Sequence, residues 1–368
     1  MSSYEKMIGR ADVDDIDAIL ALTNTDSSPL HTVTDNADAI FTWDYEKGAR
    51  PGLSRLYEKA KGAQWNGETD LPWDTEIDQE LLAQLMGAQF GFEHMDLAGT
   101  PFAKWGDKEW LQLGIESQNW TLSQFMHGEQ GALICTAKIV ETVPWIDAKY
   151  YASTQVMDEA RHVEVFAKYL DKLSGHYPIN AHLGMLLDDI VHDSRWDMAY
   201  LGMQIMVEGL ALAAFGFMHQ LTAEPLLKQL LRYVMSDEAR HVAFGVLSLK
   251  EYYAQLSDAE LGERQEFAFE AAVRMRDRFL QQEVWDRMGI DPKEAIAATQ
   301  ASPLRSEFQR MLFTKIVPNC KKLGLLDANG GWLRQRFTDL RVIEFEDFAD
   351  TGEEYEAFSL ANGEVPAA

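Results

Sequence analysis

The six residues Asp-Glu-Ala-Arg-His-Val occur twice in this chain, first in MDEARHVEVF (157–166) and again in SDEARHVAFG (236–245). Within each copy, Glu-x-x-His places a carboxylate and an imidazole one helical turn apart on the same face, where both can reach one metal ion. The two copies supply the pairs Glu159 with His162 and Glu238 with His241. A single copy would be weak evidence, because such pairs are common on exposed helix faces, whereas two identical copies indicate a site for two metal ions.

A further acidic residue precedes each motif, within an apolar stretch that is typical of a buried helix. Glu129 lies in SQFMHGEQGALI, 30 residues before the glutamate of the first motif, and Glu208 lies in LGMQIMVEGLALAAF, 30 residues before that of the second. The equal spacing predicts two antiparallel helical hairpins of the same size, with turns near Pro144 and near residue 223. Because bundles that hold two metals add one inward carboxylate from each of two other helices, six side chains are expected to meet.

Long segments with apolar residues at helical spacing run from about Lys108 to Leu256, and the alternation typical of strands is rare. The expected fold is therefore all-α, with a central four-helix bundle and additional helices at both ends. The 46 residues from His162 to Glu208 exceed what a hairpin needs, and SGHYPIN (174–180) interrupts the helical pattern within them. A crossover connection is expected there.

No strong linker divides the chain, so a single domain with three parts is expected. Residues 1–75 are interrupted by prolines and glycines and are expected to form an irregular arm with short helices. Residues 76–290 are expected to form the bundle that carries the site. Residues 291–368 are expected to form a helical extension that ends in an acidic tail.

The composition limits the partners of the protein. A net charge of −26, from 33 basic and 59 acidic residues, disfavours nucleic acid and anionic membranes. Two cysteines, Cys135 and Cys320, are too few for a disulfide framework or a four-thiolate iron–sulfur cluster, so electrons are expected from an external donor such as a reductase or ferredoxin. The start of the chain has no signal-peptide pattern and no apolar run of about 18 residues is found, so a cytoplasmic location is expected.

Charged residues flank the candidate ligands in both copies. Asp158 and Asp237 directly precede the motif glutamates, and Arg161 and Arg240 directly precede the histidines. Because a metal-binding imidazole normally donates its second N–H to a carboxylate or carbonyl, each Asp is expected to orient a histidine on the neighbouring motif helix, and each Arg to pair with an Asp. The alternative, in which all four are exposed surface charges, remains open from the sequence.

The order Glu, Glu-x-x-His, Glu, Glu-x-x-His resembles that of the ferritin-like di-iron carboxylate superfamily, over about Leu111 to Leu256. The form Asp-Glu-x-Arg-His looks most like its oxygen-activating enzymes, such as bacterial multicomponent monooxygenases. The resemblance implies a ferritin-like four-helix bundle with a non-haem site for two Fe ions, with Mn or an Fe/Mn pair not excluded, that reacts with O2 after reduction. The ligands it implies are Glu129, Glu159, His162, Glu208, Glu238 and His241.

Three positions depart from patterns within this superfamily. Phe166 stands one turn after the first motif histidine, where the radical subunits of ribonucleotide reductases commonly carry Tyr, and this disfavours a radical role. Ala211 and Leu212 stand where the hydrocarbon monooxygenases usually have Thr, so oxygen activation would be tuned differently. Val234 stands where the arylamine N-oxygenases have an extra ligating His, so a close copy of that site is not expected, while N-oxygenation itself remains open.

A substrate pocket is expected around the two lone glutamates, on the basis of helical spacing. The residues one turn away are mostly apolar and are Phe125, Met126, Ala132, Leu133, Gln204, Ile205, Ala211 and Leu212. Glycines in the same helices, among them Gly128 and Gly131, cost about 0.5–1 kcal/mol each relative to Ala and indicate close helix packing, a bulge or room for a small substrate. Core packing is the alternative role for the apolar residues.

These observations predict a di-iron oxygenase that uses O2 for hydroxylation or N-oxygenation of a largely apolar or aromatic small molecule. Two alternatives stay open: a ferroxidase or other iron-handling protein, and a dimetal bundle that is purely structural. Storage ferritins are much shorter and build shells, and a structural bundle would not need a site open to O2, so the enzyme is favoured. The oligomeric state is open, with a homodimer as one option.

Overall fold

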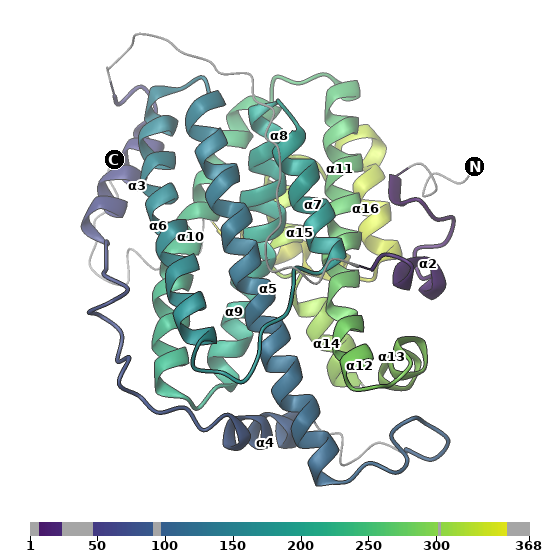
Figure 1. Ribbon diagram of the computed structural model, residues 1–368. Coiled ribbons are helices and arrows are strands. Elements are labelled where there is room, and N and C mark those ends of the chain that lie inside the picture. Colours follow the sequence, from purple (N-terminus) through teal and green to yellow (C-terminus); the bar gives the residue numbers. More distant parts are fainter. Residues whose placement is uncertain (1–6, 24–46, 91–96, 301–302, 352–368) are drawn as a thin grey trace.

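The computed structural model describes residues 7–23, 47–90, 97–300 and 303–351, and within them all regular structure is helical (Figure 1). Four long helical elements lie side by side at the centre. They are α5 (Asp107–Thr142), α6 (Ile146–Leu170), the continuous element α8–η2–α9 (Trp196–Tyr200, Leu201–Val207, Glu208–Leu221) and α10 (Pro225–Tyr253). The prediction of an all-α chain with a central four-helix bundle is confirmed.

Both predicted turns lie where the equal spacing places them. α5 ends at Thr142 and α6 begins at Ile146, which leaves Pro144 in the turn, where its missing N–H removes no helical hydrogen bond. The second turn separates α9 from α10, whose first residue is Pro225. The carboxylate of Glu224 caps α10 by accepting hydrogen bonds from two backbone N–H groups of its first turn, at 2.7 and 2.6 Å.

The connection between the two hairpins contains α7 (Ala181–His192), so the predicted crossover is confirmed. One long crossover between two hairpins is the topology of ferritin-like bundles. α7 packs against α5 and η2, and a glycine permits each approach. A Cβ atom on Gly131 would lie 2.6 Å from the side chain of Leu187, and one on Gly202 would lie 2.4 Å from that of Ile190. These two glycines therefore serve helix packing.

The helix from Trp196 to Leu221 is apolar on all sides because other elements surround it. Among the described residues it is the one helix long and apolar enough to cross a membrane, with a hydropathy of 1.6. However, 78% of its apolar window is buried inside the molecule. Its composition is that of the core helix of a helical bundle.

Part of the N-terminal region packs directly on the bundle. α3 (Pro51–Gly62) lies along α6 and α10 (Figure 1). The carboxylate of Asp147, in the first turn of α6, accepts hydrogen bonds from the backbone N–H groups of Gly48 (2.8 Å) and Arg50 (3.0 Å) and from the hydroxyl of Ser54 (2.7 Å). Within the predicted irregular arm, residues 1–6 and 24–46 lie outside the described residues.

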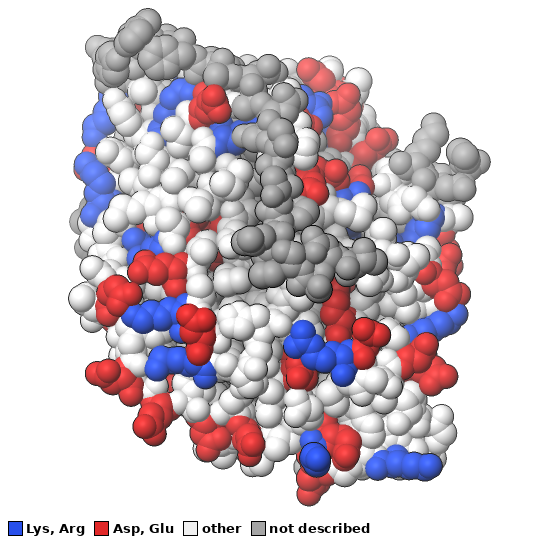
Figure 2. Space-filling model, in the orientation of Figure 1, with Lys and Arg blue, Asp and Glu red and all other residues white. Residues whose placement is uncertain are grey.

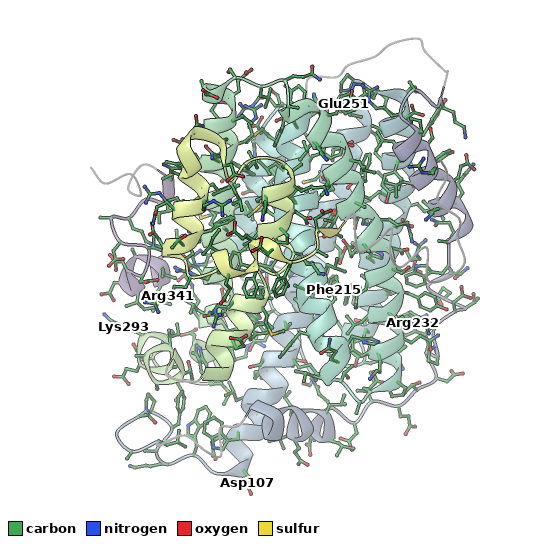
Figure 3. All side chains as sticks on the ribbon, turned by 180° about the vertical axis from the view of Figure 1, so that it is seen from behind. Asp107, Phe215, Arg232, Glu251, Lys293 and Arg341 are labelled. Carbon is green, nitrogen blue, oxygen red and sulfur yellow. The ribbon has the colours of Figure 1, made fainter. Side chains whose placement is uncertain are left out.

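The region after α10 forms the additional C-terminal helices that were predicted, and it covers the bundle on the side that faces the viewer in Figure 3. It begins with α11 (Asp258–Asp277), which packs against η2, and continues through η3 (Arg278–Leu280). The remaining helices are α2 (Ile16–Leu20) and α4 (Gln79–Phe90) before the bundle, and α12 (Gln282–Arg287), α13 (Pro292–Gln300), α14 (Pro303–Met311), α15 (Ile316–Lys322), α16 (Ala328–Asp339) and η4 (Ile343–Asp347) after it. The acidic tail from residue 352 onward lies outside the described residues, and the part boundaries at 75 and 290 remain a prediction.

Acidic and basic side chains lie close together on the face drawn in Figure 2. Exposed pairs of this kind include Arg50 with Glu251, at 2.9 Å. The described residues form no continuous basic area on that face, which agrees with the net charge of −26.

Candidate metal centre

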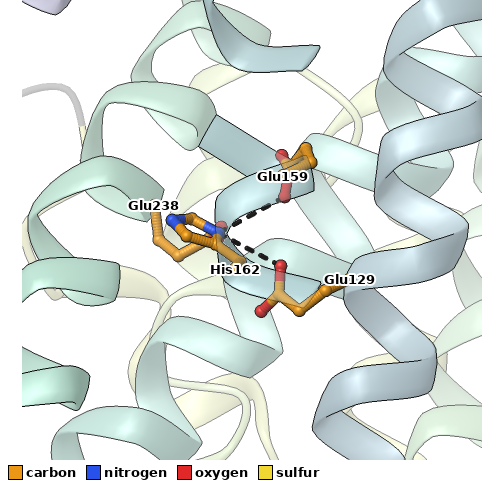
Figure 4. A group of neighbouring side chains, drawn as sticks. All are labelled: Glu129, Glu159, His162 and Glu238. Carbon is orange, nitrogen blue, oxygen red and sulfur yellow. Dashed lines mark hydrogen bonds and ion pairs between the residues drawn. The ribbon is translucent and has the colours of Figure 1, made fainter. Parts of the chain in front are cut away.

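Six carboxylate and imidazole side chains meet inside the bundle, one each from α5 and α9 and two each from α6 and α10. They form two overlapping groups, and within each group the possible ligand atoms lie within 4.8 Å of one another. One group is Glu129, Glu159, His162 and Glu238, drawn in Figure 4, and the other is Glu159, Glu208 and His241. Glu159 is shared by both groups, so a single carboxylate can reach two neighbouring ions.

The two histidines present the same ring atom to the carboxylates. Nδ1 of His162 lies 3.2 Å from an oxygen of Glu129 and 3.2 Å from one of Glu238. Nδ1 of His241 lies 3.1 Å from an oxygen of Glu159 and 3.5 Å from one of Glu238. Each motif glutamate thus approaches both histidines, since Glu159 also lies 3.5 Å from His162. The motif glutamates are central to the cluster.

Burial dominates the electrostatics of the cluster, because all six side chains are at most 5% exposed. Loss of hydration, with the negative charge of Glu238, raises the pKa of Glu129 and the pKa of Glu208 well above the usual range of a carboxyl group. Although burial acts in the opposite direction, the neighbouring carboxylates raise the pKa values of His162 and His241. A buried cluster of this kind needs cations, either protons or metal ions, to neutralise it.

The donor atoms fit two metal ions. Those without a hydrogen-bond partner are Oε2 of Glu159, Oε2 of Glu208, both carboxylate oxygens of Glu238 and Nδ1 of His241. Buried polar atoms are rarely left unpaired, and bound cations would satisfy all of these atoms together. Mixed carboxylate and imidazole ligands on facing helices of a bundle are typical of paired iron or manganese ions.

Gln155, one turn before Glu159 on α6, links two of the carboxylates. Its side-chain nitrogen donates to an oxygen of Glu159 and to an oxygen of Glu208, both at 2.9 Å, and the residue is fully buried. Gln155 was not among the residues expected from the sequence. Its spacing of four residues from a motif glutamate, on the same helical face, is the signal that would have found it.

Each aspartate of the repeat contacts the histidine of the other copy. Oδ2 of Asp237 lies 3.2 Å from Nε2 of His162, and Oδ2 of Asp158 lies 3.3 Å from Nε2 of His241. These contacts leave Nδ1 of each ring on the side of the glutamates. Carboxylates in this position fix the ring orientation and the tautomer of a metal-binding histidine.

Two buried arginines pair with these aspartates. Arg161 forms ion pairs with Asp158 and, at 3.0 Å, with Asp237, while Arg240 pairs with Asp237 and lies 3.6 Å from Asp158. Burial alone would raise the pKa of Asp237. The hydrogen bond with His162 and the charges of His162 and Arg240 nevertheless hold this pKa well below its usual range. All four charged side chains are at most 6% exposed, which contradicts the alternative of surface charges.

Two residues from the segment after α3 contact the same aspartates. The indole N–H of Trp65 donates to Oδ2 of Asp237 at 2.7 Å, and the side-chain amide of Gln64 donates to Oδ1 of Asp158 at 3.0 Å. Trp65 also stacks on Tyr233 of α10, with ring centroids 4.8 Å apart. Neither residue was expected from the sequence, because both lie in a stretch whose pattern has no link to the motifs.

The π-helical segment η2 ends immediately before Glu208. Its wider turn moves the preceding residues away from the positions that α-helical spacing predicts. Gln204 and Ile205 are fully buried against α10, where a Cβ atom on Gly245 would lie 2.6 Å from Cβ of Gln204 and 3.3 Å from Ile205. The structure thus removes Gln204 and Ile205 from the expected pocket, because they pack the core.

A small pocket, partly open to solvent, adjoins the cluster. Three cluster residues line it: Glu129, Glu208 and Glu238. Its other walls are Phe125, Ala132 and Ala211, which were expected, and Gln124, Gly128, Val207, Phe215 and Arg278, which were not. Met126, Leu133 and Leu212 were expected but lie outside it, because one helical turn either side of a glutamate spans a wider face than the pocket covers.

Two aromatic rings form part of the pocket wall. Phe125 of α5 and Phe215 of α9 meet edge to face, with ring centroids 4.6 Å apart and planes at 77°. Phe215 lies near the middle of the molecule in Figure 3. The pocket thus combines acidic residues of the cluster with an apolar, aromatic wall, as expected for a site that holds a small organic molecule.

The chain is similar to the R2-like ligand-binding oxidase with aerobically reconstituted Mn/Fe cofactor, at 17% identity and a TM-score of 0.42, over 84% of this chain and 95% of that chain. A mutant of that oxidase with anaerobically reconstituted Mn/Fe cofactor gives 17% identity and a TM-score of 0.45, over 73% of this chain and 92% of that one. No curated protein matches the sequence.

A family model matches most of the chain. The model described as p-aminobenzoate N-oxygenase AurF matches residues 47–324, which is most of the chain and includes all six residues of the cluster and every residue of the pocket wall. The match also takes in α3 and the segment with Gln64 and Trp65, which contact the aspartates of the repeat. The chain therefore belongs to the AurF family of p-aminobenzoate N-oxygenases.

Proposed function

We propose that this protein is a dimetal oxygenase that uses O2 to oxidise the nitrogen of an aromatic amine. The observation that carries the proposal is the pocket, whose aromatic wall adjoins three carboxylates of the cluster. Membership of a family described as p-aminobenzoate N-oxygenases supports an aromatic amine as the substrate class. An apolar space beside paired metals suits an organic substrate, whereas iron transit requires a polar route.

The proposed ligands of one metal ion are Glu129, Glu159, His162 and Glu238, and those of the other are Glu159, Glu208 and His241. Two iron ions, or one manganese and one iron ion, would supply the redox chemistry that activates O2. Val234, one turn before the last motif glutamate, is fully buried and offers no ligand atom, so we propose a centre with six protein ligands.

Residues around the ligands have a positioning role in this proposal. Asp237 and Asp158 accept hydrogen bonds from Nε2 of the two histidines, which directs Nδ1 of each ring to the metals. Gln155 restrains Glu159 and Glu208 through its two hydrogen bonds. Restraints of this kind keep the ligand geometry constant while a substrate enters and a product leaves.

The pocket walls have two tasks. The rings of Phe125 and Phe215 exclude water from the carboxylate cluster and offer flat surfaces against which a substrate ring can pack. The amine of such a substrate would then lie toward Glu129, Glu208 and Glu238. An external electron donor is part of the proposal, since two cysteines are too few for a four-thiolate iron–sulfur cluster within the chain.

The proposal is tested with protein that has been stripped of metal and reloaded anaerobically with Fe(II). We expect about two metal ions per chain and, after addition of O2 and reductant, conversion of 4-aminobenzoate to N-oxygenated products detected by mass spectrometry. The control is Glu159→Ala, which removes the shared ligand. Continuous oxidation of many Fe(II) ions per chain, with no organic product from any aromatic amine, would instead support iron handling.

A further inference from the structure

Arg278 is the one cationic side chain among the described residues that line the pocket. It follows α11 directly, in the short turn η3, and is 3% exposed. The same pocket is also lined by Phe125, by Phe215 and by the cluster carboxylates Glu129, Glu208 and Glu238. Neither composition nor spacing could have indicated this residue, because it lies 37 residues beyond the last motif histidine.

The guanidinium of Arg278 has no acidic partner among the described residues. Its Nε atom is buried and has no hydrogen-bond acceptor, and no described carboxylate lies within 4.0 Å of the group. Cζ of Arg278 lies 4.7 Å from the centroid of the Phe279 ring. An aromatic face offsets only part of the hydration that a buried cation loses.

The other buried arginines among the described residues differ from Arg278, because each has a carboxylate partner. Arg10 pairs with Asp277 at 2.6 Å, and Arg264 pairs with Asp197 at 2.9 Å. Arg161 and Arg240 pair with the aspartates of the repeat. Each of these four has a carboxylate within ion-pair distance, so the fold normally compensates a buried guanidinium and leaves Arg278 as the exception.

The glutamates of the cluster are not acidic partners of Arg278. In the proposed function they bind metal ions, and none of them forms an ion pair with Arg278. Burial lowers the pKa of Arg278 to about 9, so the side chain is still a cation at neutral pH. A buried cation that faces a pocket and lacks a protein partner is a binding group for an anion that arrives from solution.

We propose that Arg278 binds the carboxylate of the substrate, so that this pocket selects aromatic carboxylic acids over neutral aromatic amines. The inference rests on the proposed function and adds the group that recognises the substrate. A guanidinium forms two parallel hydrogen bonds with one carboxylate, which fixes both the position and the direction of the bound molecule. With its acid group on Arg278 and its ring packed against the wall formed by Phe125 and Phe215, the molecule would direct its other end to the cluster.

Binding without turnover tests this role. Fe(II)-loaded protein is titrated under strictly anaerobic conditions with 4-aminobenzoate and with 4-aminobenzamide, a neutral molecule of nearly the same shape, and dissociation constants are measured by calorimetry. We expect the parent to bind the acid about 10–100-fold more tightly than the amide. Arg278→Met should remove that preference by weakening binding of the acid alone, and Arg278→Lys should retain part of it.

Thermal unfolding of the ligand-free protein supplies a readout that a merely structural arginine would not produce. Arg278→Met removes an uncompensated buried charge, so its unfolding midpoint should equal or exceed that of the parent. Arg264→Met is the matched control, because it leaves Asp197 buried without a partner and should lower the midpoint. In the parent, 4-aminobenzoate should raise the midpoint, and in Arg278→Met it should not.

The proposal is overturned if Arg278→Met binds the acid as tightly as the parent, or if the parent binds acid and amide equally. A lower midpoint with unchanged binding would show that Arg278 only supports the fold. These outcomes are separate from failure of the proposed function. Tight binding of the acid through Arg278 without any oxidation by O2 would support recognition by Arg278 and refute oxygenation. Equal oxidation of acid and amide would support oxygenation and refute recognition of the carboxylate.

Discussion

Asp237 on α10 lies 3.2 Å from the Nε2 atom of His162 on α6, although the two residues belong to different copies of the repeat. The reciprocal contact joins Asp158 to His241 at 3.3 Å. Each copy therefore supplies the residue that orients the imidazole of the other. This cross-connection explains why the aspartate, glutamate and histidine recur together at the same spacing.

Replacement of Asp237 by Asn keeps the shape of the side chain but removes its charge beside His162 and Arg161. We expect metal affinity to fall about 10–100-fold, the usual effect of losing the carboxylate partner of a metal-binding histidine. Competition between the protein and a chromophoric chelator for Fe(II) measures this change. Glu164→Gln is the control, since it removes an exposed carboxylate from α6, the helix of His162, and should bind iron like the parent.

Replacement of Glu208 by Gln should affect one metal ion more than the other, because Glu208 belongs to only one of the two groups. We expect about one retained ion per chain in place of two. The metal-free variant should unfold at the same or a higher temperature than the metal-free parent, because a neutral amide ends the repulsion from Glu238 and Glu159. Metal analysis after dialysis gives the stoichiometry, and retention of two ions would show that Glu208 is no ligand.

Replacement of Gly128 by Leu should block the pocket without disturbing the fold. A Cβ atom on Gly128 meets nothing within 4 Å, and removing a helical glycine should stabilise α5 by about 0.5–1 kcal/mol. Binding of 4-aminobenzoate should be lost, as measured by calorimetry on anaerobic protein. Gly131→Leu is the comparison: its Cβ atom would lie 2.6 Å from Leu187, so this variant should lose about 1–3 kcal/mol of stability.

Replacement of Trp65 by Phe removes the 2.7 Å hydrogen bond to Asp237 and preserves a ring that can stack on Tyr233. We expect Fe(II) affinity to fall by less than in Asp237→Asn, because Arg161 still pairs with the aspartate. Competition with the same chromophoric chelator measures the Fe(II) affinity of this variant. Trp73→Phe, which removes an indole hydrogen bond to the backbone oxygen of Gly67, should leave the affinity unchanged.

The pH dependence of stability should include a contribution from His182. Burial lowers the pKa of His182 below its usual value of 6.5. The charges of Arg10 and Arg274 also lower this pKa, whereas the charge of Asp277 raises it. The neutral ring is therefore favoured in the folded protein. Its contribution to the stability of the fold is complete above about pH 6.5 and is lost as the pH falls toward the folded-state pKa. Between about pH 8 and about pH 5.5 the free energy of unfolding should fall less in His182→Gln than in the parent. An equal difference in both proteins would exclude this contribution.

The repeat determined the central bundle by itself. Helical spacing within Glu-x-x-His and the equal 30-residue separations from Glu129 and Glu208 are local properties of the chain, and α-helices keep them in any tertiary context. The turns at Pro144 and before Pro225 followed from the same arithmetic. These features were predictable because helical hydrogen bonds join residues only four apart in sequence.

The pocket was decided by tertiary structure. The π-helical turn before Glu208 is accommodated by close packing against Gly245 on α10, and it turns Gln204 and Ile205 into core residues that α-helical spacing had placed in the pocket. Trp65 comes from a segment before the bundle helices in the sequence and Arg278 from a segment after them, and neither residue lies in a motif. Their positions depend on how α3 and α11 pack on the central helices, and packing is a collective property of contacts between residues far apart in sequence, which periodicity within one segment does not encode.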